Sequence, residues 1–185
     1  MHNEVNLAYD LLLEAKIILY PTDTVWGIGC DATNEFAVKK IYYIKRRKYT
    51  KSLVILVDSY KMLSSYIAHI PKKVKTVLNE ATQPTTIVYK QPKNLAPSVV
   101  APDNTVAVRI VKSSFCKELI KRFKKPIVST SANLSGEPTP RQFSEISQAI
   151  LNNVDYVVNL QQTKLAIKPS TLLKVEGDEV IVLRE

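Results

Sequence analysis

The chain has 185 residues, of which 45% are hydrophobic, and carries a formal net charge of +9. This length and composition suit one sizeable core, and no Ser/Gly-rich or Pro-rich linker divides the sequence, so we expect a single domain over residues 1–185. The 26 Lys and Arg against 17 Asp and Glu favour polyanionic ligands.

The cysteine and histidine content argues against a metal centre. Only two cysteines occur, without a CxxC pair, and only two histidines, so we expect neither a structural zinc site nor a disulfide framework. The start lacks a basic signal region, and no apolar run approaches the ~20 residues that span a bilayer. We therefore expect a cytoplasmic protein without membrane contact.

Helical and extended patterns alternate along the chain. The apolar spacing predicts helices at residues 6–15, 34–46, 59–67, 71–80, 114–123 and 142–151. It predicts strands at residues 17–20, 53–57, 85–89, 105–111, 127–129 and 155–158, and a terminal hairpin that pairs 170–175 with 179–183. We expect Asn34 to cap the second helix. The run Leu53-Val-Ile-Leu-Val57 has no polar face, which indicates a central strand or a sheet covered on both sides. The alternation predicts an α/β domain with a mixed, twisted sheet.

Polar residues follow the first of these strands. In Tyr20-Pro-Thr-Asp-Thr-Val-Trp-Gly-Ile-Gly-Cys30, Thr22 and Thr24 flank Asp23 with hydroxyl groups, and the glycines let the backbone approach a ligand closely. Neither a Walker nor a Rossmann phosphate loop is present, so side chains would have to hold phosphates. The alternative is a turn whose threonines satisfy only backbone groups.

Two further polar runs complete a candidate site. Lys45-Arg46-Arg47-Lys48 stands at the expected end of a helix, where Lys45 and Arg47 can face one phosphate-bearing ligand and where we expect both to be exposed. Other lysine-rich stretches, at residues 72–75 and 117–125, fit solvated helix faces. The run Ser129-Thr-Ser-Ala-Asn133 places hydroxyls and an amide after a buried strand, although a helix-capping or turn cluster would use the same residues. Together the three runs indicate a nucleotide site.

The three polar runs are accompanied by three further short motifs, Val106-Ala-Val-Arg109, Pro169-Ser170-Thr171 and Leu183-Arg184. In their order, and over nearly the whole chain, these six segments resemble the motifs of the YrdC-type threonylcarbamoyl-AMP synthases. The resemblance implies a twisted, open α/β fold whose concave, basic face binds ATP and L-threonine, with bicarbonate or carbon dioxide as the carbon source. The products would be L-threonylcarbamoyl-AMP and pyrophosphate. A downstream tRNA threonylcarbamoyl transferase complex would use the adenylate to modify tRNA, and contact with tRNA or double-stranded RNA is expected. Mg²⁺ would arrive with ATP and not occupy a protein cage.

The resemblance also assigns residues. Those near L-threonine would be Thr22, Arg109, Ser129 and Ser170. Those near the nucleotide would be Lys45, Arg47, Thr105, Ser131, Asn133, Thr139 and Arg184. The catalytic set, which faces the phosphates and the adenylate, would be Lys45, Arg47, Ser131 and Asn133.

Three departures accompany the resemblance. Ala81-Thr-Gln-Pro84 stands where the family often has Trp-Pro-Gly-Pro. Lys48 stands at a position that is commonly proline, and Arg46 at one that is commonly small or polar. The linker and second domain of longer members are missing from this sequence. None of these departures removes a proposed ligand contact, so we expect them to affect efficiency and partner choice more than the reaction class.

An RNA-binding module without catalysis is the rival interpretation. The +9 charge would suit structured or double-stranded RNA held through its phosphates. Shape-based RNA binding, however, needs no small pocket lined by Thr22, Ser131 and Asn133, which argues against it as the sole activity. A structural or interaction protein is a third, weaker alternative.

Overall fold

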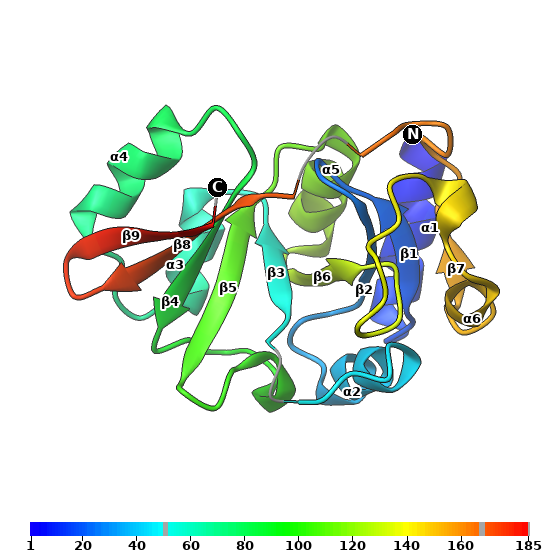
Figure 1. Cartoon of the computed structure of the whole chain (residues 1–185), viewed down its shortest axis with the longest axis horizontal. Helices are drawn as coiled ribbons and strands as arrows, with labels where there is room; N and C mark the ends of the chain where they lie inside the picture. Colours follow the sequence, from blue (N-terminus) through cyan, green and yellow to red (C-terminus); the bar gives the residue numbers. More distant parts are fainter. Residues whose placement is uncertain (50–51, 167–168, 185) are drawn as a thin grey trace.

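One mixed β-sheet runs through the molecule (Figure 1). The computed structural model describes residues 1–49, 52–166 and 169–184. The strands of this part are β1 (Ile18–Pro21), β2 (Trp26–Gly29), β3 (Val54–Val57), β4 (Thr85–Lys90), β5 (Thr105–Ile110), β6 (Ile127–Ser131), β7 (Tyr156–Val157), β8 (Thr171–Glu176) and β9 (Glu179–Arg184). Their order in the sheet is β7-β1-β2-β6-β3-β5-β4-β8-β9. The apolar strand β3 lies between β5 and β6, which confirms its predicted central place.

Helices cover both faces of this sheet. They are α1 (His2–Leu13), α2 (Glu35–Ile44), α3 (Tyr60–Tyr66), α4 (Lys72–Glu80), α5 (Ser114–Phe123) and α6 (Gln148–Leu151), with short 3₁₀ turns η1 (Pro97–Val99) and η2 (Phe143–Glu145). Alternate β1 side chains enter different cores: Ile18 joins the cluster under α1 and α5, and Leu19 joins the larger cluster that includes the buried face of α2. None of the described helices combines the length and apolar character that crossing a bilayer requires.

Several local predictions are confirmed by the described elements. The Asn34 side chain accepts a hydrogen bond from the backbone N–H of Ala37 at 3.0 Å, so it caps α2 as expected. β8 and β9 form the terminal hairpin, with Val175 opposite Val180. The sheet and its flanking helices also match the predicted mixed α/β class.

Two predictions of secondary structure are wrong. The first polar motif contains a strand, β2, which the two glycines concealed because glycine weakens strand propensity. The helix predicted at residues 142–151 is broken into η2 and α6, because Ile146 and Ser147 take extended backbone geometry with ψ of 123° and 149°. That geometry lets Ile146 enter the core, where it is only 5% exposed, so tertiary packing outweighs helix propensity.

Candidate functional site

A cavity of about 320 Å³ opens along the edge where several polar segments meet. Its lining combines three arginines with many hydroxyl groups, and none of the described lining residues carries a carboxylate. Such a lining suits an anionic ligand that offers oxygen acceptors. The predicted site residues that line it are Arg47, Arg109, Ser129, Ser131, Thr139, Ser170 and Arg184.

Strand order explains how distant segments meet at this cavity. Antiparallel pairing sets Gly27 on β2 opposite Ser131 on β6, and Ser129 opposite Val54 on β3. Further along the sheet, Arg109 on β5 pairs with Thr86 on β4. The sheet therefore carries the hydroxyl-rich strand β6 and the arginine of β5 to the same region, as the sequence predicted.

Gly27 lines the cavity where two neighbouring side chains approach its backbone closely. A Cβ at this position would lie 2.9 Å from Ser129 Oγ and 3.3 Å from the Thr22 methyl carbon, closer than ordinary contacts allow. Glycine is therefore required here by the close approach of two neighbouring segments. The close approach seen here is to two protein side chains, and the predicted approach to a ligand stays a prediction.

Lys45 occupies a different environment from the one expected. It is only 1% exposed, so the expectation of an exposed lysine is wrong. Its ammonium group donates to the backbone carbonyls of Ser131 and Asn133, the latter at 2.6 Å. Burial, and then the nearby Arg47, lowers the pKa of Lys45 to about 7. The side chain therefore fastens the loop after β6 to the end of α2.

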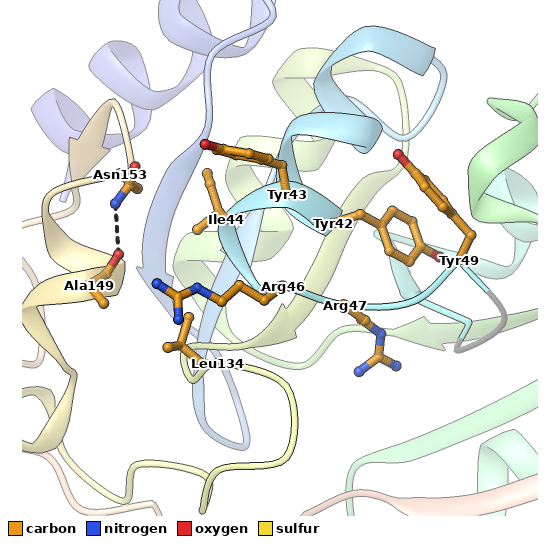
Figure 2. A pocket seen from close by; sticks show the side chains of 9 residues that line it. All are labelled: Tyr42, Tyr43, Ile44, Arg46, Arg47, Tyr49, Leu134, Ala149 and Asn153. Atoms are coloured by element: carbon orange, nitrogen blue, oxygen red, sulfur yellow. Dashed lines mark hydrogen bonds between the residues drawn. The ribbon is translucent and has the colours of Figure 1, made fainter.

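Arg47, two residues on, faces the cavity. It is half-buried, and its Nη2 donates to the backbone carbonyl of Ser52 at 2.7 Å. Arg47 also lines a neighbouring cavity of about 450 Å³ beside the end of α2. Figure 2 shows that Arg46 and Arg47 leave the chain in different directions, so the two adjacent arginines serve different surfaces.

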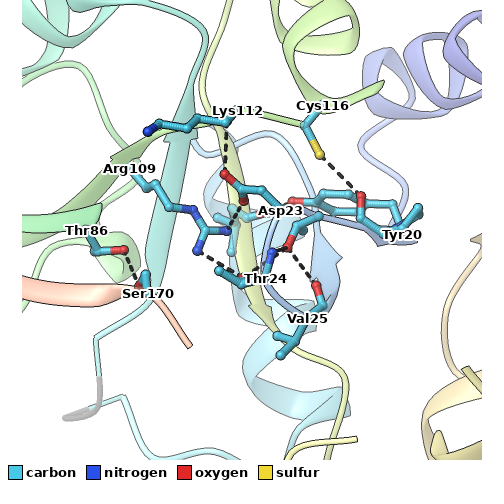
Figure 3. Close-up of polar contacts among 12 residues, drawn as sticks. Tyr20, Asp23, Thr24, Val25, Thr86, Arg109, Lys112, Cys116 and Ser170 are labelled. Atoms are coloured by element: carbon cyan, nitrogen blue, oxygen red, sulfur yellow. Dashed lines mark hydrogen bonds and ion pairs between the residues drawn. The ribbon is translucent and has the colours of Figure 1, made fainter. Parts of the chain in front are cut away.

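Arg109 is held by the loop between β1 and β2 (Figure 3). It is 6% exposed, and its Nη2 lies 3.2 Å from Asp23 Oδ1, while Nη1 donates to Thr24 Oγ1 at 3.1 Å. Asp23 Oδ2 in turn accepts the backbone N–H of Lys112 at 2.9 Å. A buried cation needs such a paired and hydrogen-bonded carboxylate. The guanidinium is thus oriented before any ligand binds.

The wall opposite β6 comes from the last hairpin and the segment before it. The Thr86 and Ser170 hydroxyls lie 2.8 Å apart, and Arg184 Nη2 donates to the Ser170 carbonyl at 2.9 Å. These contacts tie the end of β9 to the segment that precedes β8. Ser170 and Arg184 are therefore positioned at the cavity by each other.

Four predicted residues are not among those that line the cavity. Besides Lys45, they are Asn133, Thr22 and Thr105. Asn133 donates its amide to the carbonyl of Glu137 at 2.7 Å, and its buried Oδ1 has no hydrogen-bond partner among the described residues. Thr22 donates to the Val25 carbonyl at 2.7 Å, the turn-stabilising contact that was the alternative interpretation.

Thr105 lies at the other end of β5 from Arg109. Its hydroxyl donates to Asp103 Oδ1 at 2.6 Å, and its side chain is 5% exposed. Sequence reasoning did not single out Asp23 as the partner of Arg109, or Ser52 as part of the lining. The one carboxylate inside the first motif was the available signal for Asp23. No group of three or more His, Cys, Asp or Glu in the described part of the chain could hold a metal ion.

Comparison with known proteins gives a family match over most of the chain. The Sua5/YciO/YrdC family, described as "Telomere recombination", matches residues 10–185. The threonylcarbamoyl-AMP synthase of Pseudoalteromonas translucida is 35% identical over 156 residues, which cover 82% of this chain and 83% of the relative. The threonylcarbamoyl-AMP synthase of Idiomarina loihiensis is 30% identical over 171 residues, covering 91% of each chain.

Solved structures agree with this match. The P. abyssi Sua5 structure complexed with L-threonine has a TM-score of 0.87 at 25% identity, over 97% of this chain and 53% of that chain. This chain therefore spans about half the length of that protein. E. coli YciO has a TM-score of 0.86 at 22% identity over 100% of this chain and 90% of that chain, and supports the fold alone.

Proposed function

Because this chain belongs to the Sua5/YciO/YrdC family, we propose that it is a threonylcarbamoyl-AMP synthase, a nucleotidyltransferase that converts L-threonine, bicarbonate and ATP into L-threonylcarbamoyl-AMP and pyrophosphate. The observation that carries this proposal is one cavity that joins a preoriented, buried arginine, Arg109, with the two arginines Arg47 and Arg184. The first suits an amino-acid carboxylate, and the other two suit a polyphosphate.

The amino-acid half of the site is built around Arg109. Its guanidinium is fixed by Asp23 and Thr24, and a planar fork of this kind can donate two parallel hydrogen bonds to a carboxylate. Ser129 and Ser170 line the same cavity and offer hydroxyls to the substrate. Thr22 would contact threonine beside Gly27, since its methyl carbon lies 3.3 Å from the position that a Cβ of Gly27 would take.

The nucleotide half involves Arg47, Ser131, Thr139 and Arg184, which line the cavity. Lys45 and Asn133 would shape this half by holding the loop after β6, through the contacts of the Lys45 ammonium with two carbonyls of that loop. Lys45 is then a positioning residue in the ligand-free protein. The assignment of Thr105 to the nucleotide depends on the family resemblance alone.

The reaction needs no covalent enzyme intermediate. The threonine amine forms a bond to the carbon of carbon dioxide and loses a proton, which gives a carbamate. A carbamate oxygen then forms a bond to the α-phosphorus of ATP, the bond from that phosphorus to the bridging oxygen breaks, and its electron pair leaves with pyrophosphate. With bicarbonate as the carbon source, one water molecule is released as well.

The described residues contribute to this reaction by positioning the substrates and by supplying positive charge. Arg109 would hold threonine so that its amine faces the phosphate side, which raises the effective concentration of the nucleophile. Arg47 and Arg184 would stabilise the negative charge that gathers on the phosphoryl oxygens and on pyrophosphate. Mg²⁺ would arrive as part of the MgATP substrate, held by phosphate oxygens and water, because none of the described lining residues offers a carboxylate.

The setting of the reaction is part of the same proposal. Residues 1–185 would form one YrdC-like domain that works in the cytoplasm and passes the adenylate to a tRNA threonylcarbamoyl transferase complex. Contact with tRNA or double-stranded RNA is supported by the +9 charge. RNA binding without catalysis is not favoured, because a cavity of about 320 Å³ with a fixed arginine fork serves a small anionic ligand better than a duplex.

The decisive experiment is pyrophosphate release from ATP with and without L-threonine and bicarbonate. The synthase should release pyrophosphate only when both are present, and mass spectrometry should find threonylcarbamoyl-AMP. Ser131→Ala combined with Asn133→Ala should abolish this activity, whereas Ser64→Ala on α3, an exposed serine, should retain it. Pyrophosphate release that ignores threonine would disprove the assignment.

A further inference from the structure

Strongly exposed aromatic rings gather on one short stretch of the chain. Phe36 is 75% exposed, Tyr43 is 80% exposed and Tyr49 is 55% exposed, and no other Phe, Tyr or Trp in the described residues is as open to solvent. The first two lie on α2 and the third follows it. Exposed apolar surface that is gathered in one patch beside polar groups marks an interaction site, and Tyr is common at such sites.

A cavity of about 450 Å³ lies beside this stretch. Figure 2 shows Tyr43 and Arg46 at the end of α2, with Leu134 and Asn153, which follows α6, on the facing segments. The Tyr49 ring packs against Tyr42 with ring centroids 4.6 Å apart, which holds one wall in place. The cavity is large enough for a planar group the size of a nucleobase and its sugar.

Arg46 supplies an uncompensated charge at this cavity. Its guanidinium makes no hydrogen bond or ion pair with any other described residue. The backbone of Arg46 is left-handed, with φ of 49°, where the N–H of Arg47 bonds to the carbonyl of Tyr42 to close the helix. Glycine would take this conformation at least cost, so the arginine is present despite backbone strain.

We propose that this surface, formed by Phe36, Tyr43, Arg46, Lys48 and Tyr49, binds an unpaired stretch of RNA. One base would stack on Tyr43 within the cavity, and the adjoining phosphates would contact Arg46 and Lys48. Aromatic rings accept any base because every base has a π face, and interspersed cations follow the anionic backbone.

The spacing of the rings favours a strand over a free nucleotide. Phe36 and Tyr43 are seven residues apart on α2, which places them roughly 10 Å apart along the helix axis. One base cannot cover both rings, whereas successive nucleotides of an extended strand can. The five residues of this surface are not among those assigned to threonine and ATP, although Arg47 lines both this cavity and the proposed nucleotide site. The inference therefore does not need the proposed synthase function.

The test measures binding of a short, mixed-sequence, single-stranded RNA oligonucleotide by fluorescence anisotropy. Arg46→Gly should weaken binding about 10-fold and lower the salt dependence, since one phosphate contact is lost. The same change should leave the fold at least as stable as before, because glycine relieves the strain at φ of 49°. Tyr43→Ala should also weaken binding about 10-fold, the expected effect of one lost base stack.

Lys124→Gly is a matched control. Lys124 is also left-handed, with φ of 59°, at the end of α5, so the substitution makes the same backbone and charge change on another helix. It should alter RNA affinity less than 2-fold, because salt screens the long-range effect of one exposed charge. Pyrophosphate release with threonine should stay at the wild-type level in all three variants.

Several outcomes would overturn the proposal. An equal loss of RNA affinity in Arg46→Gly and Lys124→Gly would show that only the net charge of the protein matters. If an abasic strand or a fully paired duplex of the same length bound with the same affinity, a pocket for a base would be excluded. If AMP bound as tightly as the oligonucleotide, a site specific for a strand would be excluded. If Tyr43→Ala instead abolished self-association and left RNA affinity unchanged, the exposed rings would be an interface between two copies of the chain.

Discussion

Replacing Asp23 by asparagine should impair the use of threonine more than the use of ATP. Asp23 and Arg109 form a buried pair, with side chains 9% and 6% exposed and 3.2 Å between Oδ1 and Nη2. Asparagine keeps an oxygen that can accept the backbone N–H of Lys112, but it removes the charge that balances Arg109. The guanidinium then loses the partner that fixes its direction.

The size of the effect follows from that geometry. Breaking one partner of a buried pair costs about 3–5 kcal/mol, and we expect the lower end because Thr24 still accepts from Arg109. A charge-assisted hydrogen bond to the substrate carboxylate contributes about 1.5–3 kcal/mol. Misdirecting the arginine should therefore raise KM for threonine roughly 10- to 100-fold, with a much smaller change in KM for ATP.

Steady-state pyrophosphate release at varied threonine and ATP, together with urea unfolding, measures both effects. Asp10→Asn, which changes an exposed carboxylate on α1, is the matched control and should leave both quantities unchanged. The double variant Asp23→Asn with Arg109→Met should be less destabilised than the sum of the single variants, because neither charge is then left alone. Additive destabilisation, or equal changes in the two KM values, would refute the argument that Asp23 orients Arg109.

Two further predictions follow from Lys45 and Gly27. Burial lowers the pKa of Lys45 from 10.5 to about 7. Between these two pH values the unfolded chain binds a proton that the native chain does not. The free energy of unfolding should therefore rise with pH, by at most about 1.4 kcal/mol per pH unit. Urea unfolding of the wild type and of Lys45→Met from about pH 7 to about pH 9 tests this, since the variant should lose that slope, and an unchanged slope would contradict it. Gly27→Ala should lower activity at least 10-fold, because its Cβ would lie 2.9 Å from Ser129 Oγ and force that hydroxyl out of place. Ala132→Gly, at another buried small residue beside the site, is its comparison, and full activity in Gly27→Ala would show that the hydroxyl has no positional role.

Local patterns in the sequence were enough to predict much of the architecture. The apolar run of β3 identified a central strand because a strand buried on both faces tolerates no polar side. Asn34 identified the start of α2 because its side chain bonds to a backbone N–H three residues away. Both features depend on neighbours within a few residues, or on burial alone.

What could not be predicted depends on contacts between distant residues. Lys45 looks like an exposed helix-end cation in the sequence, yet its ammonium group meets carbonyls 86 and 88 residues away. Asp23 shows no sign in the sequence that its partner is Arg109 on β5. β2 was missed because its glycines are needed for close packing against β6, which local propensity cannot reveal.

This division between local and distant contacts separates two kinds of polar residue in the site. Lys45 and Asp23 have their polar atoms committed to the protein, so they set the positions of the loop after β6 and of Arg109. Arg47, Ser131 and Arg184 line the cavity itself. Substrate contact should therefore be sought first in the second group, whereas losses in the first group should appear as altered stability and as altered KM for one substrate. Motif membership alone does not distinguish these groups, but whether each side chain lines the cavity does.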